Sequence, residues 1–213
     1  DGAHRGEGLR GTLVPRLVER QLARGERRLF LYTKCEAARL FESLGFHEIA
    51  RVAGVLAFLE NSRAAFAGYL DALRERRCEH SAAVVMNANP FTLGHLRLLE
   101  RACAENARVF CFVVSHDASL VPFAARMALV RAGTARLPNV EVLPSGSYIV
   151  SGATFPSYFL KDEETVTTAH ARLDATIFVR IARALGVVRR YVGEEPFSAS
   201  TRLYNQALRA TLP

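Results

Sequence analysis

A strand, a tight turn and a helix are predicted in immediate succession between residues 82 and 103. The apolar run 82–86 is followed by the segment 87–95, which contains a proline, a glycine and two asparagines, and then by an amphipathic pattern over 96–103. Proline, glycine and asparagine are typical of turns, and apolar residues at helical spacing predict a helix with one buried face. This order constrains the chain to cross over a sheet, and it places Thr92-Leu93-Gly94-His95 at a helix N-terminus.

The sequence beyond residue 80 alternates between strand and helix patterns. Residues 109–114 are apolar at every position, as expected of a strand buried on both faces of a parallel sheet. Further helices are predicted at 123–132, ended by Gly133, and at 169–185, and further strands at 140–143 and 190–192. Because strands and helices alternate, we expect the α/β class with a Rossmann-like, doubly wound parallel sheet.

Polar segments follow three of the predicted strands. They are 87–95, Ser115-His116-Asp117 and Gly193-Glu194-Glu195. The carboxyl ends of parallel strands lie at one edge of a sheet, and the ligands of doubly wound sheets bind beyond that edge. We therefore expect these segments at the ligand-binding edge.

The first 60 residues form a separate block of α+β character. The pattern predicts a helix around 13–22, a strand at 29–32, a helix over 36–44 ended by Gly45, and a strand or pair of strands over 49–58. A helix capped by Asn61 is expected to follow as the connector. The organisation we expect is a first domain over 1–60, a connecting helix within 61–79 and a second domain over 80–213.

Composition restricts the compartment and the partners. Hydrophobic residues make up 50% of the 213, which suffices for a folded core. The four cysteines show no CxxC spacing, which indicates a reducing, cytoplasmic setting. No apolar stretch is long enough to span a bilayer, so we expect no membrane partner. The net charge of +7 reflects solvated surfaces or attraction to an anionic ligand or acidic protein; no aromatic residues interleave the basic runs, so nucleic acid is not expected.

The turn has the chemistry of a phosphate cradle. Gly94 lets the backbone approach a phosphate closely, and a helix N-terminus offers backbone N–H groups and a positive dipole end. The ring of His95 and the hydroxyl of Thr92 add two donors, and Pro90 stiffens the entry. Such donors stabilise negative charge that builds up on an α-phosphate during displacement. The alternative is a capped turn with an incidental histidine.

Residues 87–95 resemble the T/HxGH motif of the nucleotidyltransferase superfamily and, more narrowly, the citrate lyase ligase family. Three further stretches carry the narrower resemblance: 123–133, 148–161, and 192–197 followed by 204–206. The first block is similar to the C-terminal part of a GNAT-like acetyltransferase domain, through residues 32–34 and 40–46, with a pyrophosphate-loop-like segment at 5–10.

The chain begins without an initiating Met, and we expect it to be a fragment of a longer protein. The superfamily holds the β- and γ-phosphates with a later Ser/Thr-rich motif that ends in a basic residue. Arg202 lies one position early for that motif, so we expect the motif beyond Pro213.

The resemblance implies a two-step reaction. Acetate attacks the α-phosphate of ATP to form acetyl-adenylate and pyrophosphate, and the thiol of a CoA-like prosthetic group then takes the acetyl group and releases AMP. The implied cofactors are ATP and Mg²⁺, and the implied partners are acetate and the acyl-carrier subunit of citrate lyase. Two alternatives stay open, an adenylyltransferase that forms a dinucleotide cofactor and a non-catalytic nucleotide-binding fragment.

The resemblance also implies roles for individual residues. Thr92, His95 and Lys161 are the expected catalytic residues, and no metal-ligating residue is expected. The expected nucleotide-binding residues are Ala88, Asn89, Pro90, Phe91, Thr92, Leu93, Gly94, His95, Arg126 and Glu195. For three of these a simpler alternative exists: Lys161 is a solvated lysine before Asp162, Arg126 faces solvent on its helix, and Glu195 caps a loop.

Overall fold

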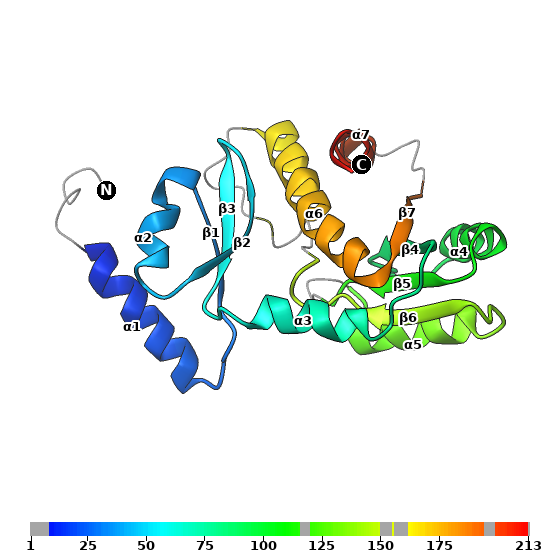
Figure 1. The fold of residues 1–213 in the computed structure, drawn as a ribbon, viewed down its shortest axis with the longest axis horizontal. Coiled ribbons are helices and arrows are strands. Elements are labelled where there is room, and N and C mark those ends of the chain that lie inside the picture. The colour runs from blue at the N-terminus through cyan, green and yellow to red at the C-terminus, as the bar shows by residue number, and fades with distance from the viewer. Residues whose placement is uncertain (1–8, 116–119, 150–154, 156–161, 194–198, 213) are drawn as a thin grey trace. The chain divides into compact units, whose positions relative to one another are not determined.

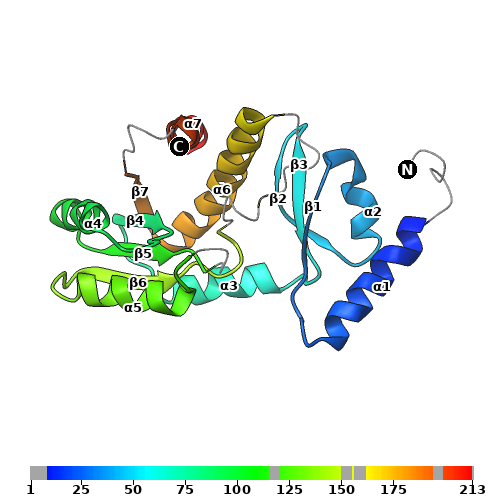
Figure 2. The same cartoon turned by 180° about the vertical axis from the view of Figure 1, so that it is seen from behind.

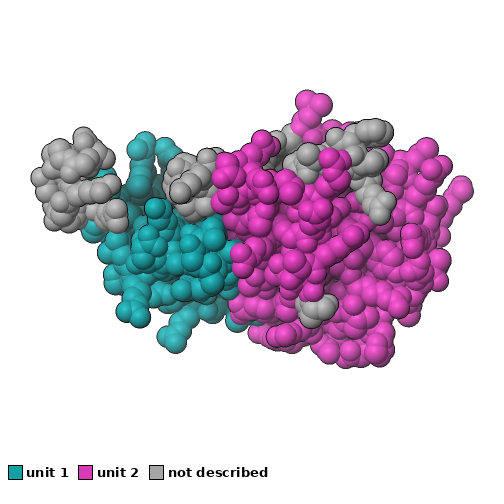
Figure 3. Space-filling model, turned by 90° about the horizontal axis from the view of Figure 1, so that it is seen from above, with its two compact units in different colours: residues 1–67 teal, residues 68–213 magenta. Residues whose placement is uncertain are grey.

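The computed structural model describes residues 9–115, 120–149, 155, 162–193 and 199–212. The chain divides into two compact units, residues 1–67 and 68–213 (Figure 3). Helix α3 (Ala65–Arg74) contains the point of division. None of the helices in the described part of the chain is long and apolar enough to cross a membrane.

The first unit is an antiparallel sheet with helices. Its elements are α1 (Leu9–Ala23), β1 (Phe30–Thr33), a short 3-10 helix η2 (Cys35–Ala37), α2 (Ala38–Glu42), β2 (His47–Val52) and β3 (Leu56–Glu60). The strands lie in the order β1-β3-β2. Ala57 and Leu59 of β3 form a small core with Ala38 and Phe46, and Val18 of α1 packs against it. The α+β arrangement is as predicted, and the segment expected as one strand or two is a pair.

Asn61 does not cap α3, so that prediction is wrong. Antiparallel pairing of β1 with β3 brings Asn61 beside the start of β1, where its Oδ1 accepts a hydrogen bond from the backbone N–H of Leu29 at 2.8 Å. The amide of Asn61 also donates to the carbonyl of Arg27 at 3.2 Å. The helix begins later, at Ala65, whose backbone N–H bonds to Oγ of Ser62 at 3.2 Å. The pairing of β1 with β3 thus engages the Asn61 side chain, which the local sequence pattern had predicted as the cap of the helix.

The second unit is built on a parallel sheet (Figures 1 and 2). Its elements after α3 are β4 (Ser81–Met86), α4 (Leu93–Glu105), β5 (Val109–Val113), α5 (Phe123–Thr134), β6 (Val140–Pro144), α6 (Glu163–Leu185), β7 (Val187–Tyr191) and α7 (Ala199–Thr211). The strands lie in the order β6-β5-β4-β7, and all neighbours are parallel. This confirms the predicted α/β class and the Rossmann-like sheet. Because the chain moves from β4 to β6 and then returns to β7, the strand order reverses between β4 and β7, which is where such sheets bind ligands.

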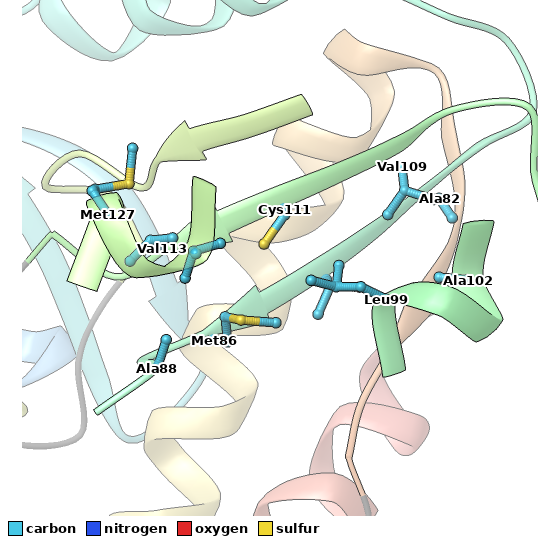
Figure 4. Packing of buried hydrophobic residues seen from close by; sticks show 11 residues of the cluster. Ala82, Met86, Ala88, Leu99, Ala102, Val109, Cys111, Val113 and Met127 are labelled. Carbon is cyan, nitrogen blue, oxygen red and sulfur yellow. The ribbon is translucent and has the colours of Figure 1, made fainter. Parts of the chain in front are cut away.

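One face of this sheet is covered by α4 and α5. Alternate residues of β4 and β5, including Met86 and Cys111, point to this face and meet Leu99 of α4 and Met127 of α5 (Figure 4). Side chains alternate between the faces of a strand, so Phe110 and Phe112, which are also buried, point to the opposite face. Burial on both faces explains why these strands are apolar at every position.

A buried ion pair joins α6, β7 and α7. Arg190 Nη1 lies 2.8 Å from Asp174 Oδ2, and the hydroxyl of Tyr204 donates to the same oxygen at 2.7 Å. The guanidinium of Arg190 also lies over the ring of Phe178, 4.4 Å from its centroid. Burial raises the pKa of Tyr204, so the phenol keeps the proton that it donates to Asp174. These contacts fasten α7 beside α6, as Figures 1 and 2 show.

Alkaline pH is expected to destabilise the second unit. Burial raises the pKa of the Cys111 thiol from 9.0 to about 12, and burial also raises the pKa values of Tyr204 and Tyr69. As pH rises, the unfolded chain loses these protons before the folded one, so folding stability falls. We expect the free energy of unfolding to decline between about pH 9 and pH 12. Urea unfolding at a series of pH values measures this, and a Cys111→Ala variant should decline less steeply. A free energy of unfolding that stays constant up to pH 11 contradicts the prediction.

Candidate active site

The predicted turn connects the carboxyl end of β4 to the first residue of α4. It begins with Asn87 and ends at Thr92, whose extended backbone (φ −123°, ψ 169°) makes it the N-cap of α4. Ala88 is buried, with 1% of its surface exposed, and has a φ of 51°. A left-handed conformation is uncommon for a residue with a Cβ, and such strain persists only where surrounding contacts hold it. The Asn89–Pro90 peptide is cis.

Thr92 and His95 form a capping box at the start of α4. The backbone N–H of Thr92 donates to Nδ1 of His95 at 3.1 Å, and Thr92 Oγ1 lies 2.8 Å from the same nitrogen. An amide N–H can only donate, so Nδ1 is the unprotonated nitrogen and the neutral ring carries its proton on Nε2. Two of the three residues that the sequence predicts as catalytic, Thr92 and His95, are therefore in contact.

The exposed part of the turn lies at the N-terminus of α4. Thr92, Leu93 and Gly94 are exposed, and His95 is half-buried. The first backbone N–H groups of any helix lack an intrahelical acceptor, so Leu93 and Gly94 present donors here. Among the described residues, a Cβ added at Gly94 would meet Oγ1 of Thr92, at 3.6 Å, which is ordinary contact. No packing contact with this part of the chain therefore requires glycine at the position.

Phe91 links the turn to α5. Its ring stacks on the His95 ring with centroids 5.7 Å apart and planes inclined by 21°. A Cβ added at Gly133 would lie 3.0 Å from Cδ1 of Phe91 and closer still to Cε1. The predicted end of α5 at Gly133 is wrong, because the helix continues to Thr134. Gly133 instead provides the space for the Phe91 ring.

Arg126 lies beneath the turn, with none of its surface exposed. Its Nη1 donates to the carbonyl of Asn87 at 2.8 Å, to Oδ1 of Asn87 at 3.0 Å and to the carbonyl of Val114 at 2.7 Å. Its Nε donates to the carbonyl of Val121 at 3.0 Å. The solvent-facing alternative is wrong for this residue, because the guanidinium is needed to satisfy carbonyl groups where strands β4 and β5 end.

Polar groups tie neighbouring strand ends together; sequence reasoning missed Ser145 and Tyr69 among them, and it expected Asn89 to bind the nucleotide. Asn89 Oδ1 accepts from the backbone N–H of Val121 at 3.0 Å. Oγ of Ser145, after β6, accepts from the backbone N–H of Ser115, after β5, at 2.9 Å. Tyr69 of α3 donates to the carbonyl of Ser145 at 3.2 Å. The available signal for Ser145 was a short polar side chain directly after an apolar strand.

The remaining predicted site residues lie outside the described residues. They are Lys161 and Glu195, together with His116 and Asp117. Their roles stay predictions. Within the described ranges, no group of three or more His, Cys, Asp or Glu side chains is arranged to hold a metal ion.

The parallel sheet, with a helix N-terminus at the point where its strand order reverses, defines a Rossmann-like α/β domain, a class whose ligands bind at this edge of the sheet. The family model for the citrate lyase ligase C-terminal domain matches residues 81–213. The chain belongs to the citrate lyase ligase family, which confirms the resemblance drawn from the sequence.

Curated relatives extend the similarity into the first unit. The chain is 40% identical over 208 residues to citrate (pro-3S)-lyase ligase of Escherichia coli strain K12, an alignment that covers 96% of this chain and 59% of the relative. Proteins of the same name from Klebsiella pneumoniae and Haemophilus influenzae are 38% and 35% identical, over 100% and 98% of this chain and 63% of each relative. The chain thus spans less than two thirds of the length of these relatives.

Proposed function

We propose that this chain is the nucleotide-binding part of an ATP-dependent ligase that acetylates the prosthetic-group thiol of citrate lyase. The observation that carries the proposal is the contact between Thr92 and the imidazole of His95 at the exposed N-terminus of α4. Gly94 supports it, because no contact with the described residues requires a glycine there, while close approach of a phosphate would. Family membership supplies the substrate class.

In the first step, a carboxylate oxygen of acetate forms a bond to the α-phosphorus of ATP, and the bond from that phosphorus to the bridging oxygen breaks. The products are acetyl-adenylate and pyrophosphate, which carries away the electron pair. Negative charge grows on the non-bridging oxygens of the α-phosphate as the bond forms. In the proposed complex the His95 ring and the backbone N–H groups of Leu93 and Gly94 would donate to those oxygens, and Thr92 would act by holding the imidazole.

In the second step, the sulfur of the carrier-bound thiol attacks the acetyl carbonyl carbon. The bond between that carbon and the phosphate oxygen breaks, AMP leaves with the electron pair, and the thiol proton passes to solvent. The partner in this step is the acyl-carrier subunit of citrate lyase with its CoA-like prosthetic group. The same donors stabilise AMP as the leaving group, because the α-phosphate keeps its place in both steps.

Further predicted residues complete the proposed site. The turn residues Ala88–His95 would line the phosphates, Lys161 would contact phosphate or the acetate carboxylate, and Glu195 would contact ribose or adenine. Mg²⁺ is held largely by the phosphate oxygens of nucleotides, so in this proposal the metal arrives with ATP. Bound in that way it would offset triphosphate charge.

We assign residues 80–213 to the ATP-binding domain, 61–79 to the connector and 1–60 to the C-terminal part of a GNAT-like domain. Support for the connector comes from α3, which occupies most of that interval and contains the division between the two compact units. Support for the assignment of residues 1–60 comes from their antiparallel sheet of β1, β2 and β3 with its helices.

Exchange of labelled pyrophosphate into ATP tests the proposed function. With the full-length protein, exchange is expected only when acetate is present, because acetyl-adenylate formation is reversible. Addition of the thiol-form carrier subunit should then give acetyl-carrier and one AMP per acetyl group. Exchange that requires a phosphorylated acceptor in place of acetate would establish an adenylyltransferase. ATP binding without any exchange would establish a non-catalytic nucleotide-binding protein.

A further inference from the structure

Helix α5 presents one stripe of residues to the turn. Arg126, Val130 and Gly133 follow one another at i, i+4 and i+7, a spacing that places them on the same side of an α-helix. Arg126 contacts Asn87, the first residue of the turn, and Gly133 contacts the ring of Phe91 near its end. Val130 lies between them in the core that also contains Ala88. The stripe therefore runs beneath the turn from its start to its last residues.

Arg126 is bonded in a way that determines where the turn begins. A guanidinium is a rigid, planar fork of donors, so acceptors on different segments are held at set positions relative to one another. Here it joins the carbonyl of Asn87 after β4, the carbonyl of Val114 after β5 and the carbonyl of Val121 before α5. Asn89 adds a second link between the turn and Val121. Lysine has one donor centre and cannot span these acceptors.

Gly133 acts at the other end of the stripe. The Phe91 ring occupies the space that a Cβ at position 133 would fill; it packs against the core and also stacks on the imidazole of His95. Any side chain at position 133 must displace the Phe91 ring. Because that ring stacks on the imidazole of His95, the displacement also moves the proposed donor of His95. Thr92 holds the same imidazole through Nδ1, so a hydrogen bond and a stacking contact both act on the ring.

We propose that α5 positions the phosphate-binding turn, with Arg126 fixing its first residue and Gly133 seating the Phe91 ring that orients the His95 imidazole. Neither residue touches the nucleotide in this arrangement; each is a positioning residue that acts through the turn. The proposal rests on the proposed function for its link to catalysis, whereas its statement about the imidazole holds independently of the reaction.

A double-mutant cycle in the full-length protein tests the Gly133 part. Gly133→Ala is expected to lower kcat for acetate-dependent exchange about 100-fold, the loss typical of a displacement of about 1 Å at a reacting group, with a much smaller change in KM for ATP. In a Phe91→Ala background the same substitution should have no further effect, because the ring it displaces is gone. Equal losses in both backgrounds would overturn the proposal.

A spectroscopic readout separates this proposal from the reaction itself. Nitrogen-15 shifts of the His95 ring should report protonation at Nε2 in the wild type, and a mixture of both tautomers in Gly133→Ala. If exchange is absent in the wild type but the His95 shifts respond in this way, the proposed function fails and the positioning role stands. An unchanged His95 spectrum in Gly133→Ala would overturn the positioning role.

Arg126 is tested by comparing Arg126→Lys and Arg126→Met with a matched control, Arg131→Met, on the exposed side of the same helix. Both Arg126 variants should lower kcat at least 10-fold per folded molecule, with little rescue by lysine, and the control should match the wild type. Thermal melts establish the folded fraction of each variant. If Arg126→Lys kept half or more of the wild-type kcat, the argument that only a guanidinium can bridge these carbonyl groups would be contradicted.

Discussion

Replacement of His95 by alanine is expected to lower kcat for acetate-dependent pyrophosphate exchange by about 100- to 1,000-fold, the loss typical when one donor to a developing oxyanion is removed. The physical reason is that Nε2–H stabilises charge that is larger in the transition state than in bound ATP. The dissociation constant for ATP, measured by calorimetry, should therefore change much less than kcat. The thermal midpoint should fall only slightly, because the capping contact contributes about 1 kcal/mol.

Two companion variants distinguish the catalytic role proposed for the His95 donor from the role of His95 in the capping box. His95→Gln retains the capping box, since glutamine at this position accepts from the N-cap backbone, and it should keep the wild-type thermal midpoint while kcat still falls. Arg97→Ala, on an exposed position of the same helix, should leave both quantities unchanged. If His95→Ala retained a third or more of the wild-type kcat, the catalytic interpretation of the turn would be wrong.

Replacement of Gly186 by alanine is expected to destabilise the second unit by about 2–4 kcal/mol. Gly186 ends α6 with a φ of 77°, a conformation that side chains disfavour, and a Cβ there would lie 2.6 Å from the carbonyl oxygen of Cys78. The backbone cannot retreat easily, because Cys78 N–H donates to the carbonyl of Leu185 at 2.9 Å and Ser81 N–H to that of Gly186 at 3.3 Å. A fall in the thermal midpoint of ~5–15 °C should result.

Gly68→Ala provides the matched control for this experiment. Gly68 lies at an exposed position inside α3 with nothing within 4 Å of an added Cβ, so alanine there should stabilise the protein by about 0.5–1 kcal/mol. Gly186→Asn separates the cost of the left-handed backbone from the cost of the close contact with Cys78, because asparagine tolerates a left-handed backbone but still carries a Cβ. If Gly186→Asn were as stable as the wild type, the contact with Cys78 would not be the cause.

Prediction from sequence succeeded where local pattern and burial agree. The strands at 82–86 and 109–114 were recognised because a parallel sheet buries both of their faces, and the strand–turn–helix order placed Thr92 and His95 correctly at the start of α4. Those features depend on residues within a few positions of one another. The same local logic predicts a helix that ends at residue 185, where α6 does end.

Prediction failed where a distant segment competes for the same residue. Gly133 reads as a helix end, yet α5 continues through it because Phe91, 42 positions earlier, occupies the space beside it. Asn61 reads as a cap, yet its side chain bonds to Leu29. Arg126 has a solvent-facing alternative from its sequence, and the structure buries it because carbonyl groups at the ends of β4 and β5 need donors.

The sequence by itself determined the chemistry at the start of α4, because a threonine and a histidine three residues apart at a helix N-terminus meet through the local geometry of the helix. Only the tertiary structure decided the strand order and its reversal between β4 and β7. It also decided that a stripe of α5 lies beneath the turn. The physical reason is that these features join residues dozens of positions apart, through packing and buried hydrogen bonds that no local pattern encodes.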